Sequence, residues 1–240
     1  MTKDTLFQKG HTSGKFEFNE RVAEVFDDML DRSIPFYGQV IAMIAEIVGR
    51  SVKEDDRVYD LGCSTGATLL ELVRILGSRK AQFVGVDNSR AMLDKAIRKA
   101  EMFGMHKEIQ FIEDDITRIE LVGAGGVILN YTLQFINPDR RLEFLKKIHA
   151  CLREEGVLIL SEKIVCQDEN LNQGYLESYH QYKKERGYSE LEIANKREAL
   201  EDVLIPLTIQ QNRDLLLEAG FRNVETFFQW FNFASIIAIK

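Results

Sequence analysis

Two glycines and an aspartate lie in one short segment, and the spacing of the glycines is typical of a turn whose backbone binds a nucleotide-like ligand. An apolar run ends in Asp60, and Gly62 and Gly66 flank a turn with Ser64 at its middle position. Glycine tolerates the backbone angles of a tight turn and leaves room that a Cβ would fill. A helical pattern begins at Ala67, so a strand, a glycine turn and a helix N-terminus follow one another. At such a junction α/β proteins bring their backbone close to a ligand.

The spacing of these glycines differs from the dinucleotide fingerprint, which places a further glycine between them. A tight strand-to-helix turn could also contain both glycines for structural reasons alone. The tract 58–66 nevertheless resembles motif I of the class I S-adenosylmethionine-dependent methyltransferases, with one glycine replaced.

Polar residues also end three further apolar runs, at 83–86, 109–112 and 127–130. Asp87 and Asn88 follow the first run about twenty residues past the glycine turn, the spacing at which a carboxylate binds ribose hydroxyls. Asp115 and Ile116 follow the second run, where a carboxylate suits an adenine amino group, and Asn130 ends the third. Any single acid could instead cap a helix or lie in a solvated turn. The ordered set indicates one edge of a parallel sheet, where ligands bind.

Composition limits the class of protein. The chain has 240 residues, of which 45% are hydrophobic and 29% charged, as in ordinary soluble domains. A net charge of −7 argues against a broad nucleic-acid surface but leaves room for a small basic pocket. The three widely spaced cysteines indicate neither a disulfide framework nor a zinc site, so no metal is expected. Because neither a signal peptide nor a bilayer-spanning apolar run is visible, we expect a cytoplasmic protein.

Alternating patterns predict the elements that position these residues. Strands are expected at 57–61, 82–86, 109–112, 127–130 and 156–162, with helices at 67–77, 89–102 and 138–152. A closing hairpin at 223–230 and 232–239 completes seven strands. This order predicts an α/β fold with a doubly wound, mostly parallel sheet and helices on both faces.

Helical segments flank that sheet within one domain, 1–240. Residues 1–50 are expected to form an arm and two cover helices, the first capped by Asn19 and the second running from 37 to 48 and stopping at Gly49. Residues 165–205 are expected to form a helical insertion after strand five, and its second helix starts at a capping box on Ser189. A last helix is expected at 208–218.

Nearly the whole chain is similar to the bacterial carboxy-S-adenosyl-L-methionine synthases. The matching segments are 19–26, 58–64, 86–89, 129–135, 160–163, 187–193 and 230–233. The Gly62-Cys63-Ser64 form of motif I and the pair Lys196-Arg197 are usual in that family. The segment after strand four lacks the Asn/Asp-Pro-Pro-aromatic signature of amino methyltransferases and carries no His, Asp or Glu as base. Ordinary methyl transfer is therefore not strongly indicated.

The resemblance implies a reaction and its partners. S-adenosylmethionine and prephenate would give carboxy-S-adenosylmethionine and phenylpyruvate. A second enzyme, a tRNA carboxymethyltransferase, would use that product to make the 5-oxyacetic acid group of a wobble uridine. The chain itself would be a homodimer that contacts neither tRNA nor membrane. Two alternatives share the same cofactor site, namely a conventional small-molecule methyltransferase and a non-catalytic S-adenosylmethionine-binding protein.

The chemistry explains why no protein base is needed. A sulfonium acidifies its methyl group, and prephenate aromatises when it loses carbon dioxide and its ring hydroxyl. The departing hydroxide can take the methyl proton, and the resulting carbon can attack the carbon dioxide in a pocket that excludes water. A cation would repel the bare sulfonium but attract the carboxylated product.

The resemblance also assigns residues. It gives Arg197 the catalytic role beside the new carboxylate, although the sequence alone would place Arg197 on a solvated helix face. Tyr175, Tyr179 and Lys163 are candidates for holding prephenate. Whether Arg197 serves its own subunit or a neighbour stays open. The expected cofactor-binding residues are Tyr37, Gly62, Cys63, Ser64, Asp87, Asn88, Asp115, Ile116, Asn130 and Arg197.

Overall fold

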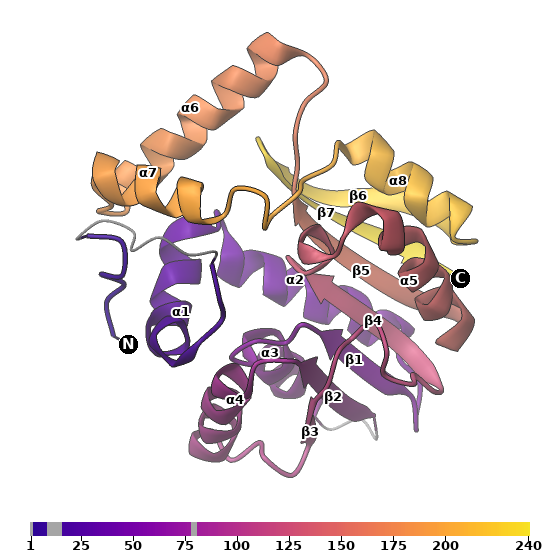
Figure 1. The fold of residues 1–240 in the computed structure, drawn as a ribbon. Helices are drawn as coiled ribbons and strands as arrows, with labels where there is room; N and C mark the ends of the chain where they lie inside the picture. The colour runs from indigo at the N-terminus through magenta and orange to yellow at the C-terminus, as the bar shows by residue number, and fades with distance from the viewer. Residues whose placement is uncertain (1, 9–15, 78–80) are drawn as a thin grey trace.

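A computed structural model describes residues 2–8, 16–77 and 81–240. Its strands form one seven-stranded sheet of order β3-β2-β1-β4-β5-β7-β6 (Figure 1). β1 to β5 run parallel, whereas β7 runs antiparallel to both β5 and β6. The doubly wound, mostly parallel sheet predicted from the sequence is therefore confirmed. The strands are β1 (Arg57–Leu61), β2 (Gln82–Asp87), β3 (Ile109–Glu113), β4 (Ala124–Asn130), β5 (Leu152–Lys163), β6 (Arg222–Trp230) and β7 (Phe233–Ile239).

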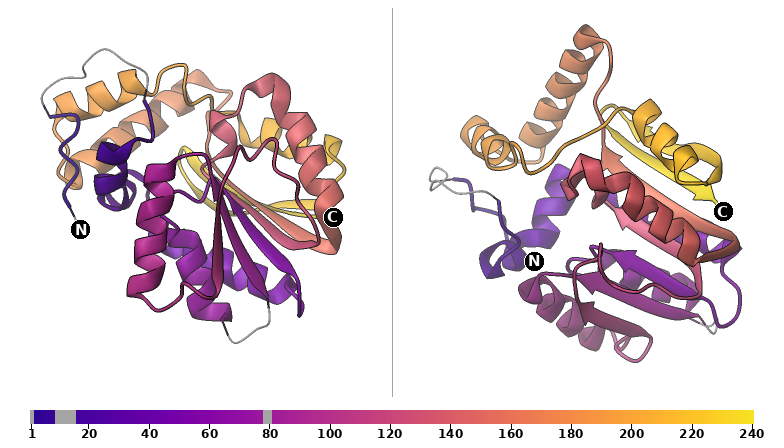
Figure 2. Two further views of the ribbon diagram at one scale, coloured as in Figure 1. Left: turned by 60° about the horizontal axis from the view of Figure 1, so that its bottom comes forward. Right: turned by 45° about the vertical axis from the view of Figure 1, so that its right-hand side comes forward.

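Helices cover both faces of the sheet because side chains on each strand alternate between two cores. On β4, Ile128 packs into one core with Ile44 of α2 and Leu69 of α3, while its neighbour Leu129 packs into the other with Leu145 of α5. These five side chains are all fully buried. One face carries α2 (Tyr37–Ser51), α3 (Ala67–Leu76) and α4 (Arg90–Met102), and the other carries α5 (Pro138–Cys151) and α8 (Ile209–Glu218) (Figure 2).

Local side-chain hydrogen bonds start the helices at the predicted residues. Asn19 caps α1 (Glu20–Ser33), Ser89 caps α4, and Pro138 occupies the first turn of α5. The capping box predicted at Ser189 is present. Each such cap satisfies N–H groups that would otherwise lack an acceptor.

The two N-terminal helices differ in use. α1 covers the ends of the strands, whereas α2 packs on one face of the sheet. Its residues Val40, Ile44 and Val48 are fully buried there. α2 also continues through Gly49, where the sequence predicted its end. A Cβ at Gly49 would come within 2.5 Å of Leu76 Cδ2 on α3. The glycine therefore permits close helix packing and does not end the helix.

The predicted helical insertion follows β5. It contains α6 (Glu169–Glu185) and α7 (Glu190–Ala199), which stand away from the sheet above the carboxyl ends of the strands (Figure 1). The N-terminal residues 2–8 lie beside α7 and α1 in the same view. Across the described parts of the chain, no helix combines the length and the apolar character that crossing a bilayer requires.

Candidate active site

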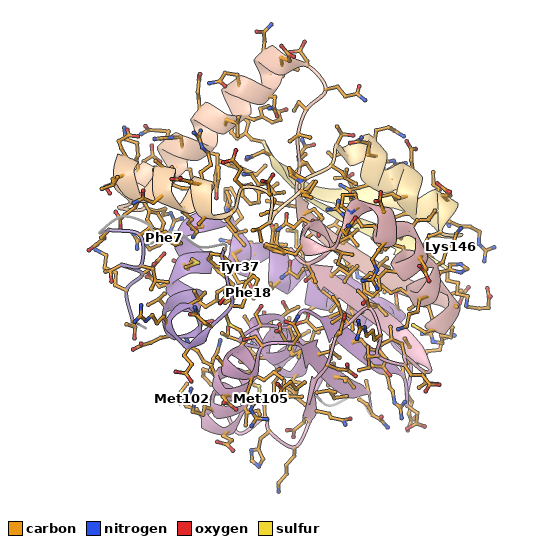
Figure 3. The ribbon with its side chains drawn as sticks, in the orientation of Figure 1. Phe7, Phe18, Tyr37, Met102, Met105 and Lys146 are labelled. Carbon is orange, nitrogen blue, oxygen red and sulfur yellow. The ribbon has the colours of Figure 1, made fainter. Side chains whose placement is uncertain are left out.

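A cavity of about 1590 Å³ lies at the carboxyl ends of the central strands, between α1 and the insertion. Its volume exceeds the roughly 300–1,000 Å³ of common small-molecule pockets, so it has room for two molecules. In Figure 3, Tyr37 and Phe18 lie near the centre of the molecule beside this region, and both line the cavity. Every residue predicted to bind the cofactor also lines it: Tyr37, Gly62, Cys63, Ser64, Asp87, Asn88, Asp115, Ile116, Asn130 and Arg197.

The turn after β1 adopts left-handed backbone angles at three positions. Gly62, Ser64 and Gly66 have φ values of 80°, 47° and 76°. A Cβ at Gly62 would lie 2.6 Å from Thr132 Cγ2, so both the turn and the neighbouring loop require glycine there. Ser64 N donates to Asp87 Oδ2 at 2.9 Å, which ties this turn to the end of β2.

Asp87 is buried at the end of β2 with both carboxylate oxygens engaged. Oδ2 accepts from Ser64 N, and Oδ1 accepts from Ser89 N at 2.9 Å. Burial raises the pKa of Asp87, while these backbone hydrogen bonds oppose the rise. Each oxygen keeps a further lone pair, so the carboxylate remains suited to accept from vicinal hydroxyls.

Two buried acceptors in the same cavity lack partners among the described residues. They are Asp60 Oδ1 and Asn130 Oδ1. Asn130 Nδ2 donates to Thr68 Oγ1 at 3.1 Å, which orients its carbonyl oxygen. Burial, with Asp87 nearby, raises the pKa of Asp60 to about 8. The ammonium group of an amino-acid ligand could donate to both oxygens, so the residues present fit a sulfonium amino acid such as S-adenosylmethionine.

Asp60 as a ligand-binding group was not predicted from the sequence. The signal was present, because a carboxylate that ends an otherwise apolar run is unusual within a buried strand.

The adenine-binding prediction rests on the connection from β3 to β4. Asp115 Oδ1 accepts from Thr117 N at 2.9 Å and from Thr117 Oγ1 at 2.7 Å. These hydrogen bonds keep the pKa of Asp115 below its usual value. Ile116 packs against the core beneath the same connection. Asp115 therefore stays ionised and fixed in a turn, with its remaining acceptor capacity free for a ligand.

At the other end of the cavity four basic side chains converge. Lys163 ends β5, Lys183 lies on α6, and Lys196 and Arg197 lie on α7. Lys183 is only 7% exposed, and burial lowers its pKa well below the usual value, helped by the other cations. Its Nζ lies 4.4 Å from the centre of the Tyr179 ring, and Lys163 Nζ lies 5.4 Å from it.

The structure separates the three residues that were candidates for holding prephenate. Tyr179 and Lys163 line the cavity. Tyr175 instead packs against Phe231, with ring centres 5.2 Å apart. Lys183 was not predicted, because the pair Lys183-Lys184 has the appearance of a solvated face on a polar helix.

A buried carboxylate, that of Glu162, supports the loop after β4. This residue was not identified from the sequence as part of the site. Glu162 Oε1 accepts from Leu133 N at 3.0 Å, and burial raises the pKa of Glu162 to about 8. Arg141, 1% exposed, donates to Gln134 O at 3.2 Å and to Ile205 O at 2.8 Å. These contacts join the loop to the end of the insertion and so fix one wall of the cavity.

Known proteins resemble the chain at two levels. A family described as "Methyltransferase domain" matches residues 58–156. A protein of Desulfotalea psychrophila named carboxy-S-adenosyl-L-methionine synthase is 54% identical over 99% of this chain and 97% of its own length. A protein of Wolinella succinogenes with the same name is 47% identical over 99% and 98%.

Solved structures show the same fold at low sequence identity. Human N-acetylserotonin methyltransferase in complex with SAM aligns with a TM-score of 0.63 and 16% identity, over 92% of this chain and 55% of that chain. An O-methyltransferase family protein of Burkholderia thailandensis aligns with a TM-score of 0.66 and 16% identity, over 92% and 60%. The chain thus spans little more than half the length of these two proteins.

Proposed function

The chain belongs to the family of carboxy-S-adenosyl-L-methionine synthases, and on this basis we propose that prephenate is the donor of the carboxyl group that it transfers to S-adenosylmethionine. The products are carboxy-S-adenosylmethionine and phenylpyruvate. The methyl carbon gains the carbon dioxide that prephenate loses, and the methyl proton and the ring hydroxide leave as water. The reaction is therefore balanced without an added oxidant, reductant or protein base.

The residues at the strand ends suit S-adenosylmethionine. Asp87 and Asn88 would hold the ribose hydroxyls, and Asp115 and Ile116 would hold adenine. Asp60 would face the positive charge of the amino-acid end. The turn 62–64, Tyr37 and Asn130 complete the binding surface. Bound there, the sulfonium supplies an activated methyl group.

One observation carries the assignment to carboxyl chemistry. The same cavity holds unpaired acceptors at one end and basic side chains at the other, among them the buried Lys183 and the exposed Arg197. A bare sulfonium gains nothing from these cations, because like charges repel strongly where water is excluded. A carboxylated product and a dianionic donor both gain from them. Arg197 would bind the carboxylate that is being transferred.

Product analysis tests this proposal. Purified protein incubated with S-adenosylmethionine and prephenate should form a species heavier than S-adenosylmethionine by one carbon dioxide, together with an equal amount of phenylpyruvate. Omitting prephenate should abolish both products. Formation of S-adenosylhomocysteine alone would instead assign the chain to conventional methyl transfer.

The cellular setting is part of the proposal. We propose a cytoplasmic homodimer whose product supplies a tRNA carboxymethyltransferase that acts on wobble uridine. The net charge of −7 supports a chain that does not bind tRNA itself, and three free cysteines fit a reducing compartment. Exposed apolar residues on the insertion support the dimer.

A further inference from the structure

The buried basic side chains of the insertion differ in how their charge is compensated. Lys196 Nζ donates to Ser33 Oγ at 2.9 Å, and Asp4 and Asp28 act on it electrostatically. The charged groups that act on Lys183 are Lys196, Lys163 and Arg197, all of them cations. The charge that acts on Lys163 is again Arg197.

Lys163, Lys183 and Arg197 are thus unpaired cations within the described residues. None of the three side chains makes an ion pair or a hydrogen bond there. Lys183 is buried, Lys163 is half-buried and Arg197 is exposed at the cavity. Burying the charge of Lys183 without a partner is costly, and a fold retains such a group where a ligand supplies the opposite charge. Three cations from β5, α6 and α7 converge on one cavity, so the missing partner is an anion with more than one negative group.

Tyr179 fixes the geometry of two of these cations. Its hydroxyl donates to Ser33 O at 2.9 Å, and its ring packs edge-on against Phe233 with centres 5.0 Å apart. The ring is therefore held rigidly, and Lys163 and Lys183 both lie over it. An ammonium over an aromatic face gains a modest attraction and keeps its N–H donors available for a carboxylate.

We propose that Lys163 and Lys183, placed over the ring of Tyr179, form a subsite for the carboxylate that stays on the donor, while Arg197 binds the carboxylate that is transferred. This subsite rests on the proposed function and names its substrate class as a dicarboxylate. Lys183 is then a substrate-binding residue. The subsite requires both sides of the cavity, since Lys163 comes from the sheet and Lys183 from the insertion.

Equilibrium binding tests the subsite without any chemistry. Protein saturated with S-adenosylhomocysteine has no methyl group to react, so titration with prephenate or phenylpyruvate reports binding alone. Lys183→Met keeps an unbranched side chain against Tyr179 but removes the charge. This variant should lower the affinity for prephenate and for phenylpyruvate by about ten- to a hundredfold, the size of one charge-assisted contact. Its affinity for S-adenosylhomocysteine should be unchanged.

Two further variants make the assignment specific. Arg197→Ala should lower the affinity for prephenate strongly and the affinity for phenylpyruvate little, because phenylpyruvate lacks the transferred carboxylate. Lys146→Met is the matched control, since Lys146 is exposed on α5 and projects away from the cavity (Figure 3). It should bind all three ligands as the unaltered protein does.

Stability separates a binding role from a structural one. Removing an unpaired buried cation should raise the thermal midpoint of the unliganded protein in Lys183→Met, whereas loss of a structural contact would lower it. Lys183→Arg keeps the charge and should retain most of the prephenate affinity.

The outcomes also distinguish the subsite from the reaction. Carboxylated product from the unaltered protein, with normal prephenate and phenylpyruvate binding in Lys183→Met, would overturn the subsite and leave the function standing. Binding that depends on Lys183, without carboxylated product, would support the subsite and remove the function. If Lys183→Met does not fold, Lys163→Met replaces it with the same expected losses, and unchanged binding there would be equally decisive.

Discussion

Asp60 carries an energetic cost that a ligand should relieve. Its carboxyl is 2% exposed, and burial together with Asp87 raises its pKa to about 8, above an unfolded value of about 3.9. Between about pH 4 and pH 8 the carboxyl of Asp60 therefore holds a proton in the folded state that it has lost in the unfolded state. The stabilising contribution of the protonated carboxyl is therefore complete below pH 4 and lost as the pH rises through 8.

Replacing Asp60 by Asn should flatten that dependence. We expect the unliganded Asp60→Asn protein to lose less stability between pH 5 and pH 8 than the unaltered protein, as measured by denaturant unfolding. Its affinity for S-adenosylmethionine should fall roughly tenfold or more, because the positive charge of the ligand loses its partner. Equal slopes against pH in the two proteins would show that Asp60 ionises freely in the fold.

The contrast between Asp60 and Asp87 shows what residue types reveal. Asp87 was predicted to bind ribose because its distance from the glycine turn is characteristic, and the structure places it at the cavity. Lys183 stands out only when its burial and its missing partners are known. The sequence marks Asp60 as unusual, but its role as an unpaired acceptor also becomes visible only from its burial and missing partners. Both properties depend on residues far away in the sequence, so local spacing could not reveal them.

At the scale of elements, a buried polar network holds α7 against the N-terminal segment and α1. Tyr188, just before α7, donates its hydroxyl to Asp4 Oδ2 at 2.7 Å. Asn195 Nδ2 donates to Phe7 O at 2.9 Å. Lys196 donates to Ser33 at the end of α1. Arg197 follows directly in the chain, so this network sets the position of its backbone.

Breaking the network should disturb the donor site more than the cofactor site. Tyr188→Phe leaves Asp4 Oδ2 without its hydroxyl donor, which should cost about 1–3 kcal/mol of unfolding free energy. We expect a raised KM for prephenate and an unchanged affinity for S-adenosylmethionine. Asp4→Asn and the double variant complete a mutant cycle. Its coupling free energy should be about 0.5 kcal/mol or more. Additive losses would mean that the two residues act separately.

The order of elements was predictable, but the placement of the insertion was not. Strand periodicity and caps such as Asn19 and Ser189 act locally, so the sequence shows them directly. The packing of α6 depends on long-range polar contacts, such as that between Tyr179 and Ser33. The true end of α2 likewise depends on the approach of Leu76 to Gly49.

On the scale of the whole molecule, the net charge is negative, whereas basic side chains gather at one end of the cavity. The chain carries a net charge of −7, yet one end of its cavity gathers unpaired cations. A negative net charge disfavours long polyanions, while a local group of basic side chains can still bind a small dianion.

An exposed apolar surface joins α6 to the β6–β7 turn. Leu171 and Phe231 are 58% and 40% exposed, and Tyr175 links them by its ring contact with Phe231. Leu171 and Tyr175 lie four residues apart and share one face of α6. Exposed apolar patches of this kind mark interfaces, and a second copy of the chain is the partner that we expect.

Sedimentation of charged variants tests this dimer. The unaltered protein should sediment as a dimer, and Leu171→Glu combined with Phe231→Glu should sediment as a folded monomer, because burying two carboxylates at an interface is costly. Met102→Glu is the matched control, since Met102 is 72% exposed on α4, away from the insertion (Figure 3).

A monomeric variant with full carboxylation activity would show that Arg197 serves the cavity of its own subunit. Loss of activity in the monomeric variant, with full activity in the control protein at the same concentration, would show that the site requires the dimer, either to hold the insertion over the cavity or to supply Arg197 from the neighbouring subunit. A monomeric unaltered protein would rule out this surface as a stable interface between two copies of the chain.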